Sequence, residues 1–250
     1  MRTYATAQMI GTRSHQCDAT AVRTGADGAR AYVLLDGIGS DDDVRDWTRA
    51  AARHLATWAA RRGDAEQGLR ALYAVYANDP RRNELFMYLP CAAAVVAVAA
   101  PGKPLKVAWC GDSRAYLLHG GIARRLTEDH NLRRVYPPTA TRPEGGNRNR
   151  ITSYLGSHRS DENVKARYGH PAIEAASVPL NGPCRLLLAS DGAYEPHADA
   201  GNDIYAEADE DKPTTAARGF VATAVDAALK AEPQYPHADN ATVLVADLTP

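Results

Sequence analysis

The chain has 250 residues, 45% hydrophobic and 24% charged, and its 29 basic and 30 acidic residues give a formal net charge of −1. This composition is that of an ordinary soluble globular protein, which argues against a disordered tail or a collagen-like repeat. The near-zero charge gives no general attraction to nucleic acid or to an anionic membrane surface, and we expect neither as a partner.

The N-terminal segment lacks the long apolar centre of a signal peptide, and no stretch offers the roughly 20 apolar residues that span a bilayer. Four widely spaced cysteines form no CxxC pair: Cys17, Cys91, Cys110 and Cys184. This spacing argues against a zinc knuckle and a small disulfide scaffold. We therefore expect reduced thiols in a cytoplasmic protein.

Short apolar runs predict buried strands at residues 31–35, 105–110, 115–118, 185–189 and 241–248. Apolar residues three or four apart predict two amphipathic helices after the first strand, one from Val44 to Trp58 and one from Leu69 to Tyr76. A third apolar stripe, Phe220 to Leu229, follows Pro213, which suits a helix start.

The segment 136–150 is rich in Pro, Gly, Asn and Arg without an apolar period, which predicts an exposed loop. The predicted strands and helices do not alternate regularly, so an α+β layered domain fits better than a parallel doubly wound fold.

Aspartates occur at the ends of predicted strands or close to them, most of them beside turn-forming residues: Asp18, Asp36, Asp112, Asp191 and Asp239. A strand end fixes the direction of a carboxylate, and a following glycine lets the backbone or an ion approach closely. Any one of these is also an ordinary turn signal. Several converging carboxylates would bind hard cations.

Six motifs follow one another in a particular order: DGIGS, GDSRAYLL, LTEDHN, ITSYLGS, LLLASDG and ADNATVLVA. In this order they resemble the bacterial branch of the metal-dependent serine/threonine protein phosphatases, the type 2C or PPM family, from about Arg13 to Leu248. The resemblance implies a four-layer α-β-β-α sandwich, with two central antiparallel sheets flanked by helices. It also implies a single domain over residues 1–250 with an exposed flap-like loop around 131–172.

The resemblance further implies a metal site. Asp36 would bridge two metal ions, the Gly37 carbonyl would ligate one, Asp191 and Asp239 would complete the other, and Asp18 would hold a metal-bound water. Ligation by oxygen alone favours two Mn²⁺ or Mg²⁺ ions over Zn²⁺.

Two more residues have alternative interpretations. Arg13 would grip the substrate phosphate with charge-assisted hydrogen bonds, or else is a surface arginine. Asp112 would help bind a third, weaker cation, or else only orients its turn.

The implied activity is metal-dependent hydrolysis of phosphoserine or phosphothreonine on a protein substrate, by a water bridged between two divalent cations in a monomer. Four positions depart from the family pattern. Cys17 replaces an acidic residue, Ser40 replaces a glycine, Ile38 stands where animal members often carry a histidine, and the strand PCAAAVVAV lacks a threonine. The alternative is a catalytically weak or inactive phosphatase-fold signalling or binding module, and a third possibility is hydrolysis of small phosphate esters.

Other polar residues near the motifs have simpler interpretations. Asp41, Asp42 and Asp43 are expected to cap the first helix. His15, His130 and His237 are expected to be hydrogen-bonded turn histidines. A redox role for the Cys17 thiol would require local positive charge.

Overall fold

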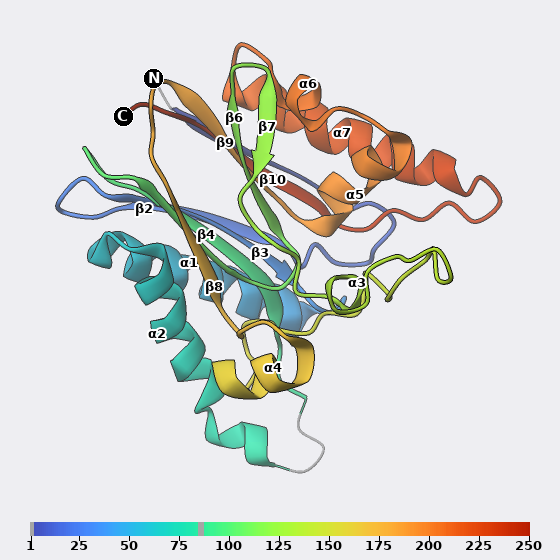
Figure 1. Ribbon diagram of the computed structural model, residues 1–250, viewed down its shortest axis with the longest axis horizontal. Coiled ribbons are helices and arrows are strands. Elements are labelled where there is room, and N and C mark those ends of the chain that lie inside the picture. The colour runs from blue at the N-terminus through green and yellow to red at the C-terminus, as the bar shows by residue number, and fades with distance from the viewer. Residues whose placement is uncertain (1–2, 85–87) are drawn as a thin grey trace.

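The computed structural model describes residues 3–84 and 88–250 (Figure 1). Its strands form two five-stranded antiparallel sheets. The first sheet has the order β1 (Tyr4–Met9), β10 (Ala241–Leu248), β9 (Cys184–Ala189), β6 (Arg114–His119) and β7 (Ile122–Arg125). The second has the order β2 (Ala19–Thr24), β3 (Arg30–Gly37), β4 (Ala92–Ala99), β5 (Leu105–Cys110) and β8 (Glu174–Val178).

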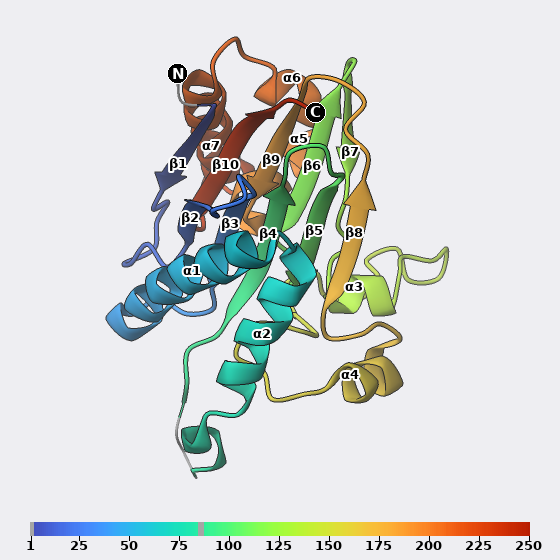
Figure 2. The ribbon, with the colours of Figure 1, turned by 90° about the vertical axis from the view of Figure 1, so that its left-hand side faces the viewer.

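Helices cover the outer face of each sheet (Figures 1 and 2). The second sheet is covered by α1 (Asp42–Arg62) and α2 (Ala65–Ala77), and the first by α5 (Asp191–Ala200), α6 (Ile204–Ala208) and α7 (Pro213–Ala231). The connections contain a 3-10 helix (Pro80–Asn83), α3 (Leu132–Val135) and α4 (Asp161–Tyr168). The predicted four-layer α-β-β-α sandwich is therefore confirmed.

The central strands are apolar throughout because both of their faces are buried. In β3, Val33 and Leu35 face the α1–α2 layer, whereas Leu34 faces the other sheet. In β10, Val243 faces the α5–α7 layer and Leu244 packs between the sheets. A period-two alternation thus supplies two apolar layers from one strand.

An N-terminal cap fixes the start of α1, and one close contact fixes how α2 packs against it. Asp41 Oδ1 accepts the Val44 N–H at 2.8 Å, which confirms the predicted cap, while Asp42 and Asp43 form the first helical turn. The two helices then approach so closely that a Cβ on Gly68 would lie 2.6 Å from the Cα of Ala59.

All five strands and all three helices predicted from the sequence are present. Residues 136–150 contain no helix or strand and are mostly exposed, as predicted. By contrast, Thr152, Ser153 and Leu155, which follow that loop, are buried. Within the described residues, no helix is long and apolar enough to cross a membrane.

Candidate functional site

The five predicted aspartates lie at one edge of the two sheets. Asp18 directly precedes β2, and Asp36 is near the end of β3. Asp112 lies in the turn between β5 and β6, Asp191 begins α5 and is separated from β9 by Ser190 alone, and Asp239 lies just before β10. Antiparallel pairing sets the start of each strand beside the end of its neighbour, as in the pairs Ala19–Leu35 and Val243–Ala189, so these positions gather at the same edge.

Asp18 and Asp112 are buried, whereas Asp36, Asp191 and Asp239 are partly exposed, and the five carboxylates interact through their charges. Asp18 and Asp112 are 2% and 3% exposed. Burial raises the pKa of Asp18 to about 8, and the charge of Asp191 adds to the rise. The nearby hydroxyls of Thr242 and Ser190 partly offset it, although neither makes a hydrogen bond of regular geometry to the Asp18 carboxylate. Burial, followed by the charges of Asp191 and Asp18, also raises the pKa of Asp36 well above its ordinary value.

Three oxygens in this group have no hydrogen-bond partner: Asp18 Oδ1, Asp18 Oδ2 and Asp112 Oδ1. An unpaired buried carboxylate is unfavourable unless a cation or a donor compensates it. In residues 3–84 and 88–250, however, no three His, Cys, Asp or Glu side chains are gathered into a ready-made set of metal ligands. The orphaned oxygens and the mutual repulsion of the carboxylates nevertheless fit bound divalent cations.

Arg13 lies at the rim of this group. Its Nη2 donates to Asp239 Oδ2 at 2.6 Å, and its Nε is buried without a partner. The hydrogen bond to Asp239 raises the pKa of the Arg13 guanidinium, and the charges of Asp191 and Asp36 act in the same direction. Arg13 is therefore a fixed cation beside the carboxylates, with a donor still free.

The glycines that follow two of the aspartates are required by close approaches of the chain. A Cβ on Gly37 would lie 2.6 Å from the Cys17 carbonyl oxygen. A Cβ on Gly192 would collide with the carbonyl oxygen of Asn240. Glycine thus lets these segments meet at the site.

An open cleft of about 860 Å³ contains Arg13, Asp191, Gly192 and Asp239. Its other lining residues come largely from α5 and α7, so it continues between these helices, away from the carboxylates. A small group bound beside Arg13 would therefore leave room for the rest of a larger ligand.

Sequence reasoning missed three residues around the site. Asn240 Oδ1 accepts the Cys17 N–H at 2.8 Å, and its Nδ2 donates to the Ile10 carbonyl at 3.0 Å, so it joins the segments that carry Asp18 and Asp239. Its position within the ADNATVLVA motif was a usable signal. Arg148 and Glu195 line the cleft and form an ion pair at 3.1 Å, and no sequence signal distinguished this loop arginine from its neighbours.

The other residues discussed from sequence occupy ordinary environments. Cys17 is 1% exposed, and burial raises the pKa of its thiol, which does not favour a reactive thiolate. Ser40 Oγ lies 2.9 Å from Ser14 Oγ. His15 Nδ1 lies 2.9 Å from Ser14 Oγ, and His130 is hydrogen-bonded, as predicted.

Comparison with known proteins agrees with this geometry. Residues 36–135 match the family profile described as Protein phosphatase 2C. A rice (Oryza sativa subsp. japonica) protein named "Probable protein phosphatase 2C 8" is 31% identical over 180 residues, which are 68% of this chain and 41% of that protein. The match thus spans about two fifths of the length of that curated relative.

Solved structures resemble the whole chain. The PPM Ser-Thr phosphatase MsPP from Mycobacterium smegmatis has a TM-score of 0.68 at 24% identity, covering 98% of this chain and 97% of that one. The Mycobacterium tuberculosis serine/threonine phosphatase PstP/Ppp has a TM-score of 0.65 at 22% identity, covering 99% and 98%. At these identities the likeness shows a shared fold. Together with the sequence matches, it shows that the chain belongs to the protein phosphatase 2C (PPM) family.

Proposed function

We propose that this chain hydrolyses phosphoserine and phosphothreonine in phosphorylated proteins, with divalent cations held at the carboxylate edge. The observation that supports this most directly is the set of buried carboxylate oxygens without partners, on Asp18 and Asp112, in the same group of aspartates as Asp239, to which Arg13 donates. Anionic groups that face one another in this way need positive charge to compensate them.

Two Mn²⁺ or Mg²⁺ ions are the proposed cofactors, with a third, weaker one. Asp36, the Gly37 carbonyl, Asp191 and Asp239 would hold the first two, Asp18 would orient a water beside them, and Asp112 would contribute to the third. When bound, such cations make water more acidic and neutralise charge that develops on phosphorus.

The protein's own groups would bind and orient the substrate. Arg13 has an unsatisfied Nε–H and can donate to a phosphoryl oxygen. Ile38 offers no proton to a leaving alkoxide, so this step does not rely on a histidine at that position. The cleft between α5 and α7 would hold the polypeptide that flanks the phosphorylated residue.

We further propose that residues 1–250 form one catalytic domain, with residues 131–172 acting as a flap beside the site. A monomer in the cytoplasm, in a signalling role, fits the four cysteines, which form no disulfide with one another. It also fits the scattered origin of the exposed large apolar side chains: Met9, Ile10, Val75, Tyr88, Ile122, Tyr136 and Tyr235. The net charge of −1 supports a protein substrate over nucleic acid or a membrane surface.

The test is phosphate release from p-nitrophenyl phosphate and from a phosphothreonine peptide, with Mn²⁺, Mg²⁺ or a chelator. Asp191→Asn should lose at least about 100-fold of the metal-dependent rate, because a ligand carboxylate is removed. Asp211→Asn, an exposed position outside the site, is the matched control. Equal rates for wild type and Asp191→Asn would refute the proposal.

A non-catalytic module is the second candidate, because the buried thiol of Cys17 adds no negative charge next to Asp18. It predicts that folded, metal-loaded protein binds a phosphopeptide without releasing phosphate. If that result is found, Cys17→Glu is the first variant to examine for recovered turnover. Small phosphate esters are tested in parallel against phosphopeptides, and a preference for the esters would change the proposed substrate.

A further inference from the structure

A second cavity, of about 490 Å³, lies beside the active-site cleft, between α3, α5 and the strands β6 and β7. Arg148, Glu195 and Asp199 line both spaces. A polypeptide that binds Arg13 through one side chain can therefore place a nearby side chain in the second cavity, because α5 borders both spaces.

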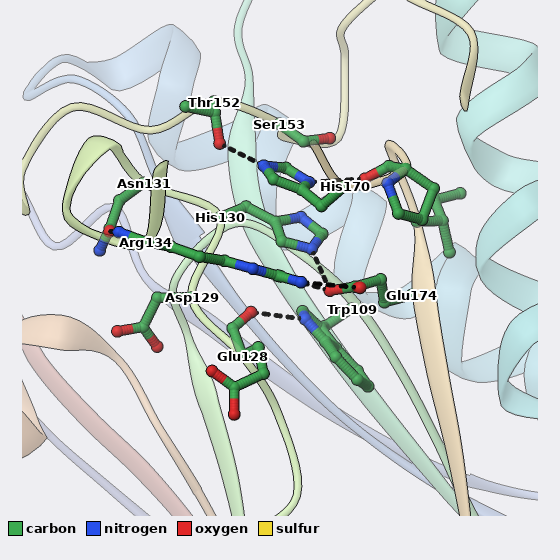
Figure 3. Close-up of polar contacts among 12 residues, drawn as sticks. Trp109, Glu128, Asp129, His130, Asn131, Arg134, Thr152, Ser153, His170 and Glu174 are labelled. Atoms are coloured by element: carbon green, nitrogen blue, oxygen red, sulfur yellow. Dashed lines mark hydrogen bonds and ion pairs between the residues drawn. The ribbon is translucent and has the colours of Figure 1, made fainter. Parts of the chain in front are cut away.

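Arginines dominate the charge of this second cavity, and four of them are neutralised within the protein. Each makes an ion pair of at most 3.0 Å with a carboxylate: Arg114 with Asp129, Arg125 with Glu128, Arg134 with Glu174, and Arg148 with Asp199. Figure 3 shows the Arg134 side chain directed at Glu174. These pairs add little net charge to the cavity.

Arg133 on α3 differs from the other four. Among the described residues, no carboxylate lies within ion-pair distance of its guanidinium, and every acidic side chain that lines the cavity is paired with another arginine. Its Nη2 donates to the Glu144 carbonyl oxygen at 3.1 Å, which holds the side chain in place. Its Nε is buried without a hydrogen-bond partner. A half-buried cation with an unsatisfied donor is stabilised by an anion.

We infer that Arg133 binds a second anionic group of the substrate polypeptide, close in sequence to the phosphoresidue that is hydrolysed. This inference rests on the proposed function, in which the phosphoresidue that is hydrolysed binds beside Arg13 and the carboxylates. An acidic side chain and a second phosphorylated residue share the required chemistry, since each presents oxygens that accept charge-assisted hydrogen bonds from a guanidinium. Arg133 is thereby a specificity-determining residue, which favours phosphoresidues in an acidic context.

The experiment compares phosphothreonine peptides that differ only in one flanking residue, which is Gln, Glu or phosphoserine and is moved one position at a time along the peptide. For wild type, we expect kcat/KM to be about tenfold higher when the acidic group reaches the cavity, and the preference to shrink as salt is added. Arg133→Gln should remove the preference while leaving the Gln peptide nearly unchanged. The Glu and phosphoserine series show which of the two sources is favoured.

Arg124→Gln is the matched control, because Arg124 is exposed on neighbouring β7, does not line the cavity, and loses the same charge. Thermal unfolding of both variants checks that they fold. A preference for acidic peptides that survives in Arg133→Gln, or that falls equally in Arg124→Gln, overturns the inference.

Equilibrium binding of the same peptides, made with a non-hydrolysable phosphonate in place of the phosphothreonine, separates this inference from the proposed activity. An Arg133-dependent, roughly tenfold tighter binding of the acidic peptides supports the inference even if no phosphate is released. Binding that does not depend on Arg133 overturns it, even if hydrolysis is fast.

Discussion

His130 Nε2 lies 2.8 Å from Glu174 Oε2, which joins the segment after β7 to strand β8 (Figure 3). The imidazole is fully buried, and its Nδ1 accepts a long hydrogen bond, 3.4 Å, from the N–H of Gly111. Burial lowers the pKa of His130, so the neutral ring donates from Nε2 and accepts at Nδ1. His130 therefore connects Glu174 with the turn that carries Asp112.

Two substitutions separate the functions of the two ring nitrogens. His130→Asn keeps an acceptor near the Nδ1 position, whereas His130→Gln keeps a donor near Nε2 and loses that acceptor. Both should lower the free energy of unfolding by about 1–3 kcal/mol, because each breaks a buried hydrogen bond. We expect Mn²⁺ affinity, measured by calorimetry, to fall several-fold further in His130→Gln, because the Asp112 turn loses its support.

The main-chain bonds of this region are independent of the side chain, since the His130 N–H donates to the Gly111 carbonyl at 2.9 Å in either variant. Equal Mn²⁺ affinities in the two variants would mean that Nδ1 does not position the turn. His130→Asn serves as the control for His130→Gln, because it keeps an acceptor near the Nδ1 position.

The stacked pair His130–His170, with ring centroids 4.2 Å apart, predicts a loss of stability in mild acid. Burial, and next the neighbouring His130 imidazole, lowers the pKa of His170 from 6.5 to about 4, while Glu174 and Arg134 also face this pair. The unfolded chain therefore binds the proton more tightly. The contribution to stability is complete above pH 6.5 and is lost as the pH falls toward 4.

His170→Gln should flatten this pH dependence, by about 1–3 kcal/mol across that interval, in urea unfolding followed at several pH values. His158→Gln, at an exposed position, is the control. An unchanged slope in His170→Gln would assign the acid sensitivity to another group.

Two helical glycines predict opposite responses to alanine. On α2, a Cβ at Gly68 would lie 2.6 Å from the Cα of Ala59, so Gly68→Ala should destabilise the protein by about 1–3 kcal/mol through overpacking. On α7, nothing lies within 4 Å of a Cβ at Gly219, so Gly219→Ala should stabilise it by about 0.5–1 kcal/mol. Chemical denaturation measures both, and a stabilised Gly68→Ala would show that α1 and α2 can separate at little cost.

The strands that sequence periodicity predicted and those it missed differ in their place in the sheets. Periodicity missed the four edge strands β1, β2, β7 and β8, and also the internal strand β4, which only the family resemblance marked as a strand. The five strands that it found, β3, β5, β6, β9 and β10, are all internal. An internal strand is buried on both faces and has a continuous apolar run. An edge strand such as β7, with the sequence IARR, is largely exposed and lacks that signal.

The candidate site also contains residues that the sequence predicted and residues that it missed. Asp36, Asp112, Asp191 and Asp239 were found because they stand in short motifs beside strand ends, and Asp18 was found through the family resemblance of the segment that follows Arg13. The contacts of Arg148 and Arg133 depend on how the loop 136–150 and α3 fold back onto α5, which is set by tertiary packing and leaves no local pattern.

We expect the Asp18 carboxyl group to lower the stability of the cation-free protein and to strengthen cation binding. Its two carboxylate oxygens have no hydrogen-bond partner, and the carboxylates of Asp191 and Asp239 add to its unfavourable environment. Asp18→Asn removes the cost of burying this carboxyl group, whether it is ionised or held protonated by its raised pKa, so in chelator it should raise the free energy of unfolding by about 1–3 kcal/mol. The same change should reduce the rise in Tm that Mn²⁺ gives to wild type, because less negative charge remains to attract the cation.

Thermal unfolding of wild type, Asp18→Asn and the exposed control Asp211→Asn, each with chelator and with Mn²⁺, measures both effects. Destabilisation of Asp18→Asn in chelator would show instead that the carboxylate makes a favourable contact in the folded protein, and the electrostatic argument for cations at this edge would then lose its support.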